Sequence, residues 1–202
     1  MSGVKWLLHN YGEKSNCQRF GKYPTTVRNS DHYIDEYIYG LVERWDYLID
    51  WTARAKNEAK FIVNKLHKRG AKNVLDSATG TGFDSIQLLH AGFSVTSMDG
   101  SYGMLVKAKQ NAKKQNVKLS IMHSDWRKMQ KVPFNQYDAV ICLGNSISHL
   151  FTEEEQLQSL LAFYRCLKPN GILIVDHLNY ERIFQIGGFD RHTLYFAGKD
   201  VD

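Results

Sequence analysis

The sequence predicts an α/β fold in which helices cover both faces of a mostly parallel sheet. Three observations predict it. From residue 73 onward, short apolar runs alternate with longer stretches of helical apolar spacing. A glycine-containing loop, residues 78–82, follows the first run, and the first two runs end in Asp76 and Asp99. In such a sheet the carboxyl ends of the strands share one edge, and ligands bind there where the strand order reverses.

The chain before residue 73 has a different character. Residues 1–31 are polar, contain glycine and proline, and predict a loosely structured arm. Helical spacing begins at residue 32, resumes through Ile62 and Leu66, and stops at Gly70. We therefore expect two helices within residues 32–70. A length of 202 residues suits one domain, which we place over residues 32–202.

The expected elements after residue 70 follow one another regularly. Strands are predicted by apolar runs at residues 73–76, 93–99, 119–123, 137–143 and 172–176. Helices are predicted by apolar periodicity at residues 84–90, 102–115 and 153–167. A turn at residues 169–171, with the sequence Pro-Asn-Gly, precedes the last strand.

Composition limits the setting of the protein. The longest apolar runs, residues 139–143 and 172–175, are far shorter than the roughly 20 residues that span a bilayer, so we expect no membrane span and a cytoplasmic location. Three cysteines, Cys17, Cys142 and Cys166, form no C-x-x-C pair and are interpreted as reduced thiols without a metal. The net charge of +5 is spread along the chain, so it gives little reason to expect a nucleic-acid or membrane partner.

The glycine loop and the second strand together indicate a nucleoside. Gly80 and Gly82 lack the Cβ that would collide with a closely approaching ligand, and the alternative is a tight turn made only for packing. Asp99, about twenty residues on, is placed to accept hydrogen bonds from both ribose hydroxyls. The third position of G-x-G-x-x-G is Ser85, where dinucleotide folds have glycine or alanine, which disfavours NAD.

Two residues after the third strand extend this interpretation. Asp125 offers a carboxylate for an adenine amino group, and the ring of Trp126 can pack on the base. The alternative is a surface aspartate beside a half-buried tryptophan.

Several motifs carry a family resemblance. VLDSATGTG, residues 74–82, resembles motif I of the Rossmann-like class I S-adenosylmethionine-dependent methyltransferases. More specific segments resemble glycine N-methyltransferase: residues 93–99, YDAVICLGNS at 137–146, HL at 149–150 and DHxNY at 176–180. With YP at residues 23–24 and WxxxIDW at 45–51, the resemblance extends to the glycine sarcosine N-methyltransferases of betaine synthesis. It covers nearly the whole chain.

The resemblance implies S-adenosylmethionine as cofactor, S-adenosylhomocysteine as product, and a role for each matching residue. Ala78 and Gly80 would contact the methionine moiety, Asp99 the ribose, and Met104, Asp125 and Trp126 the adenine. Leu143 and His149 would line the sulfonium region, and Asp76 and Gly82 would complete the cofactor site. Trp45 and Arg54 would close it from helices 32–70, which act as a lid. Asn145 and His149 are the implied catalytic residues, and Asn145, Tyr37 and Leu178 the substrate side.

Three of these roles have ordinary structural alternatives. His149 could cap the helix that begins near residue 152, Trp45 could belong to the core, and Arg54 could be a solvated helix charge. Asn145 is less easily explained without a loop or a ligand to satisfy, because it is a short amide at the end of a buried strand.

The implied reaction is methylation of a small amine by direct in-line displacement, without a metal or a covalent nucleophile, by a protein that could form a homo-oligomer. The resemblance fails at Leu178, where the family has an arginine that grips the substrate carboxylate, so glycine as acceptor is in question. The antiparallel hairpin that ends class I methyltransferases is expected to be missing or incomplete, since only residues 193–197 could begin it.

Two other functions stay open at the sequence level. The basic charge allows a nucleic-acid methyltransferase, but GNS at residues 144–146 lacks the Pro-Pro-Tyr pattern that holds a flipped base. Leu178 and the incomplete hairpin allow a catalytically idle protein that only binds S-adenosylmethionine.

Overall fold

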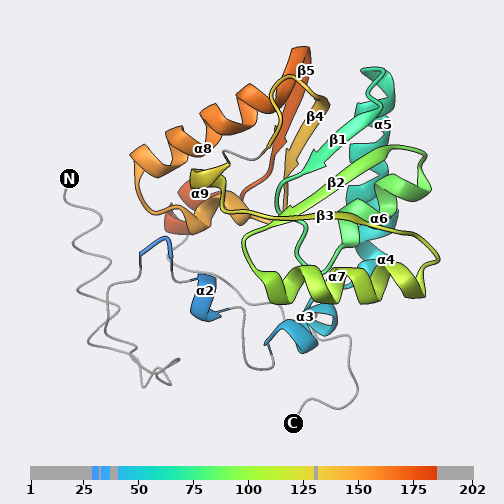
Figure 1. The fold of residues 1–202 in the computed structure, drawn as a ribbon. Helices are drawn as coiled ribbons and strands as arrows, with labels where there is room; N and C mark the ends of the chain where they lie inside the picture. The colour runs from blue at the N-terminus through green and yellow to red at the C-terminus, as the bar shows by residue number, and fades with distance from the viewer. Residues whose placement is uncertain (1–28, 32, 37–40, 130–131, 186–202) are drawn as a thin grey trace.

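The computed structural model describes residues 29–31, 33–36, 41–129 and 132–185, and within them one five-stranded parallel sheet. The strands are β1 (Asn73–Asp76), β2 (Ser94–Asp99), β3 (Ser120–His123), β4 (Tyr137–Cys142) and β5 (Leu167–Val175). Their order is β3-β2-β1-β4-β5 (Figure 1), and all four neighbouring pairs are parallel. Successive strands are therefore added on one side of β1 as far as β3 and then on its other side as β4 and β5, so the strand order reverses between β1 and β4. The predicted α/β architecture is confirmed.

Alternate residues of the strands pack into two different hydrophobic clusters. Val74 and Ile141 lie in the cluster that includes Ile62 and Leu66 of α5 (Lys60–Lys68), together with α6 (Phe83–His90). Leu75 and Val140 point the other way, into the cluster around Phe163 of α8 (Glu153–Cys166). Because successive strand side chains face opposite sides of a sheet, helices cover both faces, as the buried apolar runs predicted.

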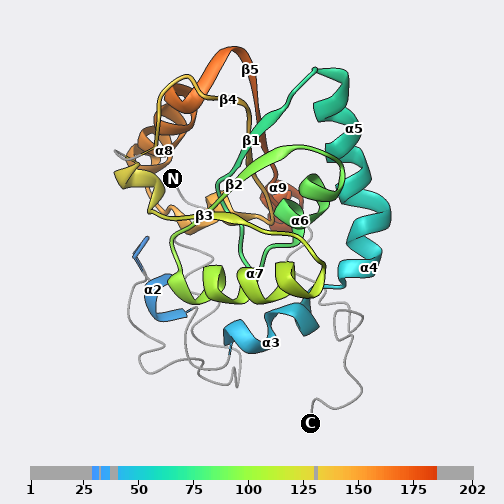
Figure 2. The same ribbon diagram turned by 45° about the vertical axis from the view of Figure 1, so that its right-hand side comes forward.

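A third cluster extends the first face. Ile86 of α6 packs with Ala108 and Ala112 of α7 (Tyr102–Lys114). Small alanine side chains let the two helices approach closely. Figure 2 shows α7 crossing in front of the carboxyl ends of the strands, with α3 (Leu41–Leu48) beneath it. Asn111 of α7 donates to Asp46 of α3 at 2.8 Å, which ties the two helices together.

The helices before β1 differ in detail from the two that were predicted. Short helices α2 (Tyr33–Glu36) and α3 come first, and the second predicted helix runs from Trp51 to Lys68 as α4 (Trp51–Arg54), a π-helical turn η1 (Ala55–Ala59) and α5. Asp50 caps its start by accepting from the backbone of Ala53. The helix stops next to Gly70, as predicted, and Gly70 takes a positive φ of 67°.

The predicted turn at residues 169–171 lies inside β5. Leu167 pairs with Tyr137 and Ile172 with Ala139, so β5 bulges between these two pairs. Asn170 adopts the left-handed conformation that such a bulge requires, with φ 66°. The strand therefore begins earlier than predicted, at Leu167, and the predicted Pro-Asn-Gly turn forms an irregular stretch within it.

Several expectations fall outside the described residues. Of the expected arm, residues 1–31, the structure describes only residues 29–31, and it does not describe the segment 193–197, where a further strand was expected. The predicted domain boundary at residue 32 therefore stays a prediction. In the part of the chain that is described, no helix is long and apolar enough to cross a bilayer.

Candidate active site

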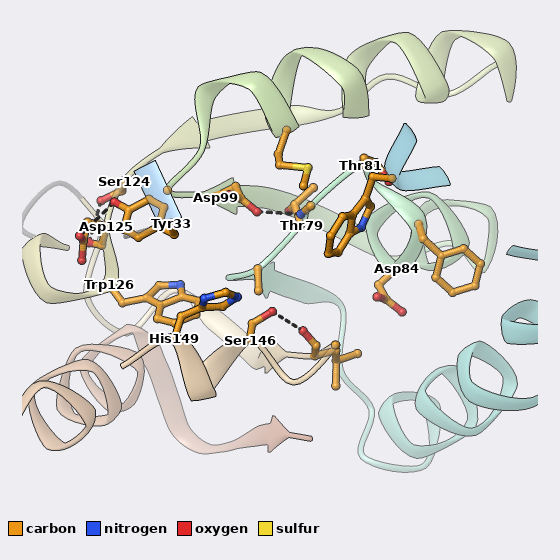
Figure 3. A pocket seen from close by; sticks show the side chains of 18 of the residues that line it. Tyr33, Thr79, Thr81, Asp84, Asp99, Ser124, Asp125, Trp126, Ser146 and His149 are labelled. Atoms are coloured by element: carbon orange, nitrogen blue, oxygen red, sulfur yellow. Dashed lines mark hydrogen bonds between the residues drawn. The ribbon is translucent and has the colours of Figure 1, made fainter. Parts of the chain in front are cut away.

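A cleft opens beyond the carboxyl ends of β1, β2 and β4, at the point where the strand order reverses, and its empty space is about 920 Å³ with open solvent included. Side chains from the sheet edge and from the helices before β1 point into it (Figure 3). Its lining includes ten of the predicted site residues: Trp45, Arg54, Ala78, Gly80, Asp99, Met104, Asp125, Trp126, Leu143 and His149. The topology thus brings together residues spread over more than a hundred positions of sequence.

The loop between β1 and α6 contains two glycines with different functions. At Gly82, with φ 99°, a Cβ would lie 3.1 Å from the Cβ of Ala108, so this glycine allows α7 to pack against the start of α6. Gly80, with φ 52°, would bring a Cβ within 4 Å of no protein atom, and it lines the cleft. Packing therefore explains Gly82, which is not among the lining residues, whereas Gly80 leaves room for a ligand.

Asp99 joins the glycine loop to the end of β2. Its carboxylate accepts hydrogen bonds from the backbone N–H of Gly80 at 2.7 Å and of Ser101 at 2.8 Å. Burial raises the pKa of Asp99, and these two hydrogen bonds oppose the shift because they favour the charged form. Two backbone donors leave lone pairs of the carboxylate available, as hydroxyl recognition requires.

Asp125 and Trp126 lie on one side of Asp99 in the cleft, and Asp84 lies on the other (Figure 3). The indole Nε1 of Trp126 donates to the carbonyl oxygen of Ser77 at 2.6 Å, which fixes the ring against the glycine loop. Asp125 accepts from the Tyr33 hydroxyl at 3.2 Å and from Arg127. Burial alone would raise the pKa of Asp125, but the hydrogen bonds from Arg127 outweigh it and lower the pKa. Asp125 is thus held as an ionised acceptor beside an aromatic surface.

The opposite end of the cleft holds a cation between two carboxylates. Arg54 contacts Glu58 at 2.7 Å and Asp84 at 3.2 Å, and its guanidinium lies 4.5 Å from the ring centre of Phe83. The Arg54 side chain is only 18% exposed, so it is not a solvated helix charge. Burial raises the pKa of Asp84 to about 6, against the opposing effect of Arg54. A ligand carboxylate reaching Arg54 would compete with Asp84.

Asn145, after β4, is occupied by contacts within the protein. It takes the left-handed conformation, with φ 61°. Its side chain donates to Ser148 at 2.9 Å and to the Tyr180 hydroxyl at 2.8 Å, and accepts from the backbone of Leu178 at 3.0 Å. Asn145 therefore joins the loop after β4 to the segment after β5. It does not line the cleft itself, although its neighbours Gly144 and Ser146 do.

Two other predicted residues, Asp76 and Leu178, are not among the residues that line the cleft. Asp76 is fully buried beneath the glycine loop, where it accepts from Ser85 at 2.6 Å, and burial raises its pKa to about 7. Leu178 is 40% exposed and lies next to Asn145 rather than in the lining. Tyr37 lies outside the described residues. The cofactor and substrate roles of these residues stay predictions.

The cleft also contains residues that the sequence did not reveal. Tyr33, Phe83 and Asp84 are the most informative of them. An acidic residue in the first turn of a helix is usual on electrostatic grounds, so Asp84 gave no distinctive signal. Tyr33 lies in a segment interpreted as helix, and only its long-range contact with Asp125 marks it. Among the described residues, no group of three or more His, Cys, Asp or Glu side chains could hold a metal ion.

Comparison with known proteins agrees with this geometry. Residues 74–171 match a family described as a methyltransferase domain. The glycine/sarcosine N-methyltransferase of Aphanothece halophytica is 50% identical over 94% of this chain and 71% of its own length. The chain belongs to the glycine/sarcosine N-methyltransferase family. The enzyme of the same name from Halorhodospira halochloris is 48% identical over 91% of this chain and 69% of its own length.

A solved structure extends the comparison to the fold. A methyltransferase from Clostridium acetobutylicum superposes with a TM-score of 0.60 at 22% identity, covering 77% of this chain and 60% of its own. This likeness concerns the fold alone. The family resemblance predicted from the sequence motifs, and the Rossmann-like class I architecture with it, are confirmed.

Proposed function

We propose that this member of the glycine/sarcosine N-methyltransferase family transfers a methyl group from S-adenosylmethionine to the nitrogen of a small amine of the glycine or sarcosine type. The relatives from Aphanothece halophytica and Halorhodospira halochloris both bear the name glycine/sarcosine N-methyltransferase. The observation that carries the proposal is the half-buried Asp99 carboxylate, held by the Gly80 N–H inside the cleft. It supports a nucleoside site at the strand edge where α/β folds bind ligands.

The residues present fit S-adenosylmethionine. The Asp99 carboxylate has about four lone pairs, and two of them accept hydrogen bonds from backbone N–H groups. The others are left to accept hydrogen bonds from two ribose hydroxyls. The absent side chain of Gly80 leaves space for the cofactor beside the loop. Trp126, Met104 and Asp125 would surround the adenine, and Arg54 would hold the terminal carboxylate at the other end.

The chain's residues would contribute alignment and exclusion of water. S-adenosylmethionine would supply a methyl group already activated by its sulfonium, so an uncharged amine could attack the methyl carbon without a metal or a covalent nucleophile. The bond from carbon to sulfur would break, S-adenosylhomocysteine would leave, and the methylated ammonium would release its proton to solvent. Leu143 and His149, which follow β4, both line the cleft. We assign to them the orientation of the methyl group toward the amine. Asn145 would support this loop through Ser148.

Recognition of the acceptor is the least conventional part of the proposed site. Leu178 replaces the arginine expected from the family motif and donates only its backbone N–H, to Asn145. Arg182, on α9 (Tyr180–Gln185), is our candidate for a substitute cation, with Arg191 as the other candidate. We also propose a cytoplasmic setting and a homo-oligomer. The setting agrees with the buried free thiols of Cys142 and Cys166.

The test is incubation with methyl-labelled S-adenosylmethionine and a panel of acceptors: glycine, sarcosine, dimethylglycine, ethanolamine and RNA. Labelled methyl groups should appear in glycine, sarcosine or both. Label in RNA alone would favour the nucleic-acid alternative that the charge of +5 suggests. Binding of S-adenosylhomocysteine without transfer to any acceptor would favour an idle binding protein, and absence of both would contradict the proposal.

A further inference from the structure

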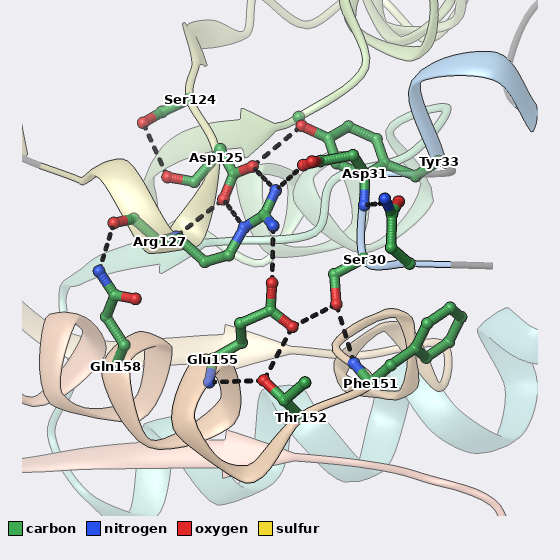
Figure 4. A network of polar contacts seen from close by, with 12 residues as sticks. Ser30, Asp31, Tyr33, Ser124, Asp125, Arg127, Phe151, Thr152, Glu155 and Gln158 are labelled. Atoms are coloured by element: carbon green, nitrogen blue, oxygen red, sulfur yellow. Dashed lines mark hydrogen bonds and ion pairs between the residues drawn. The ribbon is translucent and has the colours of Figure 1, made fainter. Parts of the chain in front are cut away.

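Three carboxylates surround the guanidinium of Arg127, which follows the predicted adenine residues in the short helix η2 (Trp126–Lys128). Nε and Nη2 of Arg127 contact the two oxygens of Asp125, the first at 3.0 Å (Figure 4). Nη1 contacts Glu155 at 2.9 Å, and Nη2 also contacts Asp31. The Arg127 side chain is only 12% exposed. We call these four residues the Arg127 cluster.

The cluster attaches the segment before α3 to the body of the protein. Asp31 contributes one carboxylate, and its neighbour Ser30 donates to Glu155 and accepts from the backbone of Phe151 at 2.9 Å. Ser30 and Tyr33 both line the cleft, as do Asp125 and Arg127. Ser30, Asp31 and Tyr33 therefore bridge the start of α8 and the nucleoside end of the cleft, where Asp125 and Trp126 would hold the adenine.

Tyr33 extends this bridge to the residue after Asp99, whose carboxylate is proposed to bind the ribose. Its hydroxyl donates to Asp125, and its ring lies directly on the backbone of Gly100, the residue after Asp99. A Cβ built on Gly100 would be 2.8 Å from the Tyr33 ring, so an alanine there would have to displace the end of this side chain. Two independent features, the guanidinium contacts and the Gly100 surface, thus fix the same short segment.

Arginine is the residue type that this arrangement needs. A planar guanidinium offers five donors in a fixed fork and can bind two or three carboxylates at once, whereas a lysine ammonium is a point charge. Hydrogen bonds from Ser30 and Arg127 lower the pKa of Glu155, so this carboxyl stays ionised in the cluster. Without Arg127, three ionised groups would be left close together with no shared cation, and they would repel one another.

We propose that Arg127 is a positioning residue that clamps Ser30, Asp31 and Tyr33 across the nucleoside end of the cleft, and that this clamp sets the affinity for S-adenosylmethionine and its product. Arg127 acts through Asp125 and Tyr33 rather than on the methyl group. The inference rests on the proposed function, because it assigns the nucleoside to this end of the cleft. It predicts that affinity depends on residues far from the glycine loop.

The experiment compares Arg127→Met, Arg127→Lys, Asp31→Asn and Gly100→Ala with the wild type in the full chain. Lys168→Met is the matched control, because it also removes one cation from an ion pair, with Asp138 at the opposite end of the sheet. Calorimetry measures the Kd of S-adenosylhomocysteine. Hydrogen exchange of the peptide covering residues 29–36 measures attachment of the segment without ligand, and the melting midpoint is recorded for each variant.

Arg127→Met and Arg127→Lys should both weaken S-adenosylhomocysteine binding about tenfold or more, as expected for loss of one charge-assisted contact. Gly100→Ala, which leaves Arg127 intact, should also weaken binding, and Asp31→Asn should do so to a smaller extent. Exchange of residues 29–36 should become faster in all four variants. Lys168→Met should change neither measurement, even if it lowers the melting midpoint.

Equal affinity and equal exchange in wild type, Asp31→Asn and Gly100→Ala would overturn the clamp, whether or not the Arg127 variants fold. A lower melting midpoint of Arg127→Met with unchanged Kd would reduce Arg127 to a structural residue and overturn it as well. Failure of the wild type to bind S-adenosylhomocysteine would instead overturn the proposed function. The exchange comparison would then still decide whether Arg127 attaches the segment.

Discussion

At the scale of single residues, Asp99 has the most consequential position. Asp99→Asn removes the charge and places an amide where two backbone donors already point. We expect the affinity for S-adenosylhomocysteine to fall roughly ten- to hundredfold, because hydrogen bonds to a charged group contribute about 1.5–3 kcal/mol. Calorimetry measures this. Asp138→Asn, at the other end of the sheet, is the control, and an unchanged Kd in Asp99→Asn would contradict the assigned nucleoside site.

Leu178 permits a test in the opposite direction, by restoring an interaction. Leu178→Arg should lower the KM for glycine about tenfold or more, because a guanidinium can bind the acceptor carboxylate bidentately. Steady-state assays with glycine and with ethanolamine distinguish this effect from a general one, since ethanolamine has no carboxylate. Leu178→Met serves as the control of similar size. If glycine turnover stays unchanged or falls in Leu178→Arg, another residue recognises the carboxylate.

Several of the residues that sequence reasoning placed correctly in the cleft lie at the ends of apolar strands, whereas Trp45, Arg54 and Met104 lie on helices and were expected only from the family resemblance. Asp99 and Leu143 could be located because a buried strand is recognisable from its own residues and its end is then known. Tyr33 and Asp84 could not be located in this way. Their places in the cleft depend on contacts with Asp125 and Arg54, and such distant pairings leave no local pattern.

At the scale of elements, the two glycines of the loop between β1 and α6 have different functions, because Gly82 allows helix packing and Gly80 leaves room for a ligand. Gly82→Ala should destabilise the protein by about 1–3 kcal/mol, because an alanine at φ 99° is strained and its Cβ would crowd Ala108. Gly80→Ala should cost less stability and instead weaken S-adenosylhomocysteine binding, because its Cβ would enter the cleft. Urea unfolding and calorimetry on both variants test this contrast. Equal effects of the two variants on both measurements would refute it.

Strands and helices differed in how far the sequence determined them. The predicted strands at residues 73–76 and 137–143 match β1 and β4 within one residue, because both are buried on two faces and read as continuous apolar runs. The π-helical turn η1 could not be predicted. Its residues, AKNEA, have no local preference for π winding, so it must follow from the packing of α4 and α5 on different partners.

At the scale of the whole molecule, buried carboxyls should govern the pH dependence of stability. Burial raises the pKa of Asp76 from 3.8 to about 7. The folded protein then binds more protons than the unfolded chain between about pH 4 and pH 7, so this stability is complete below pH 4 and is lost as the pH rises through 7. Asp84, with a pKa of about 6, acts in the same direction.

Asp76→Asn should therefore flatten the fall in unfolding free energy between pH 5 and pH 8, because the amide does not titrate. Urea unfolding at several pH values measures the slope. Asp138→Asn is the control: hydrogen bonds from Lys168 and from backbone N–H groups lower the pKa of Asp138, so its contribution changes only in acid. A slope in Asp76→Asn as steep as in the wild type would show that other groups are responsible.

The π-helical turn η1 has a consequence for the angular phase of the helix that contains it. Each residue advances an α-helix by about 100°, so the phase between Arg54 on one side of the turn and Ile62 and Leu66 on the other depends on how the turn is wound. Deleting Asn57 alone should restore uniform winding and leave Arg54 facing the cleft, because a π-helical turn takes up one extra residue without changing the phase of the α-helical turns on either side. Such a protein should remain folded by circular dichroism and bind S-adenosylhomocysteine as the wild type does, and clearly weaker binding would contradict this account of the turn.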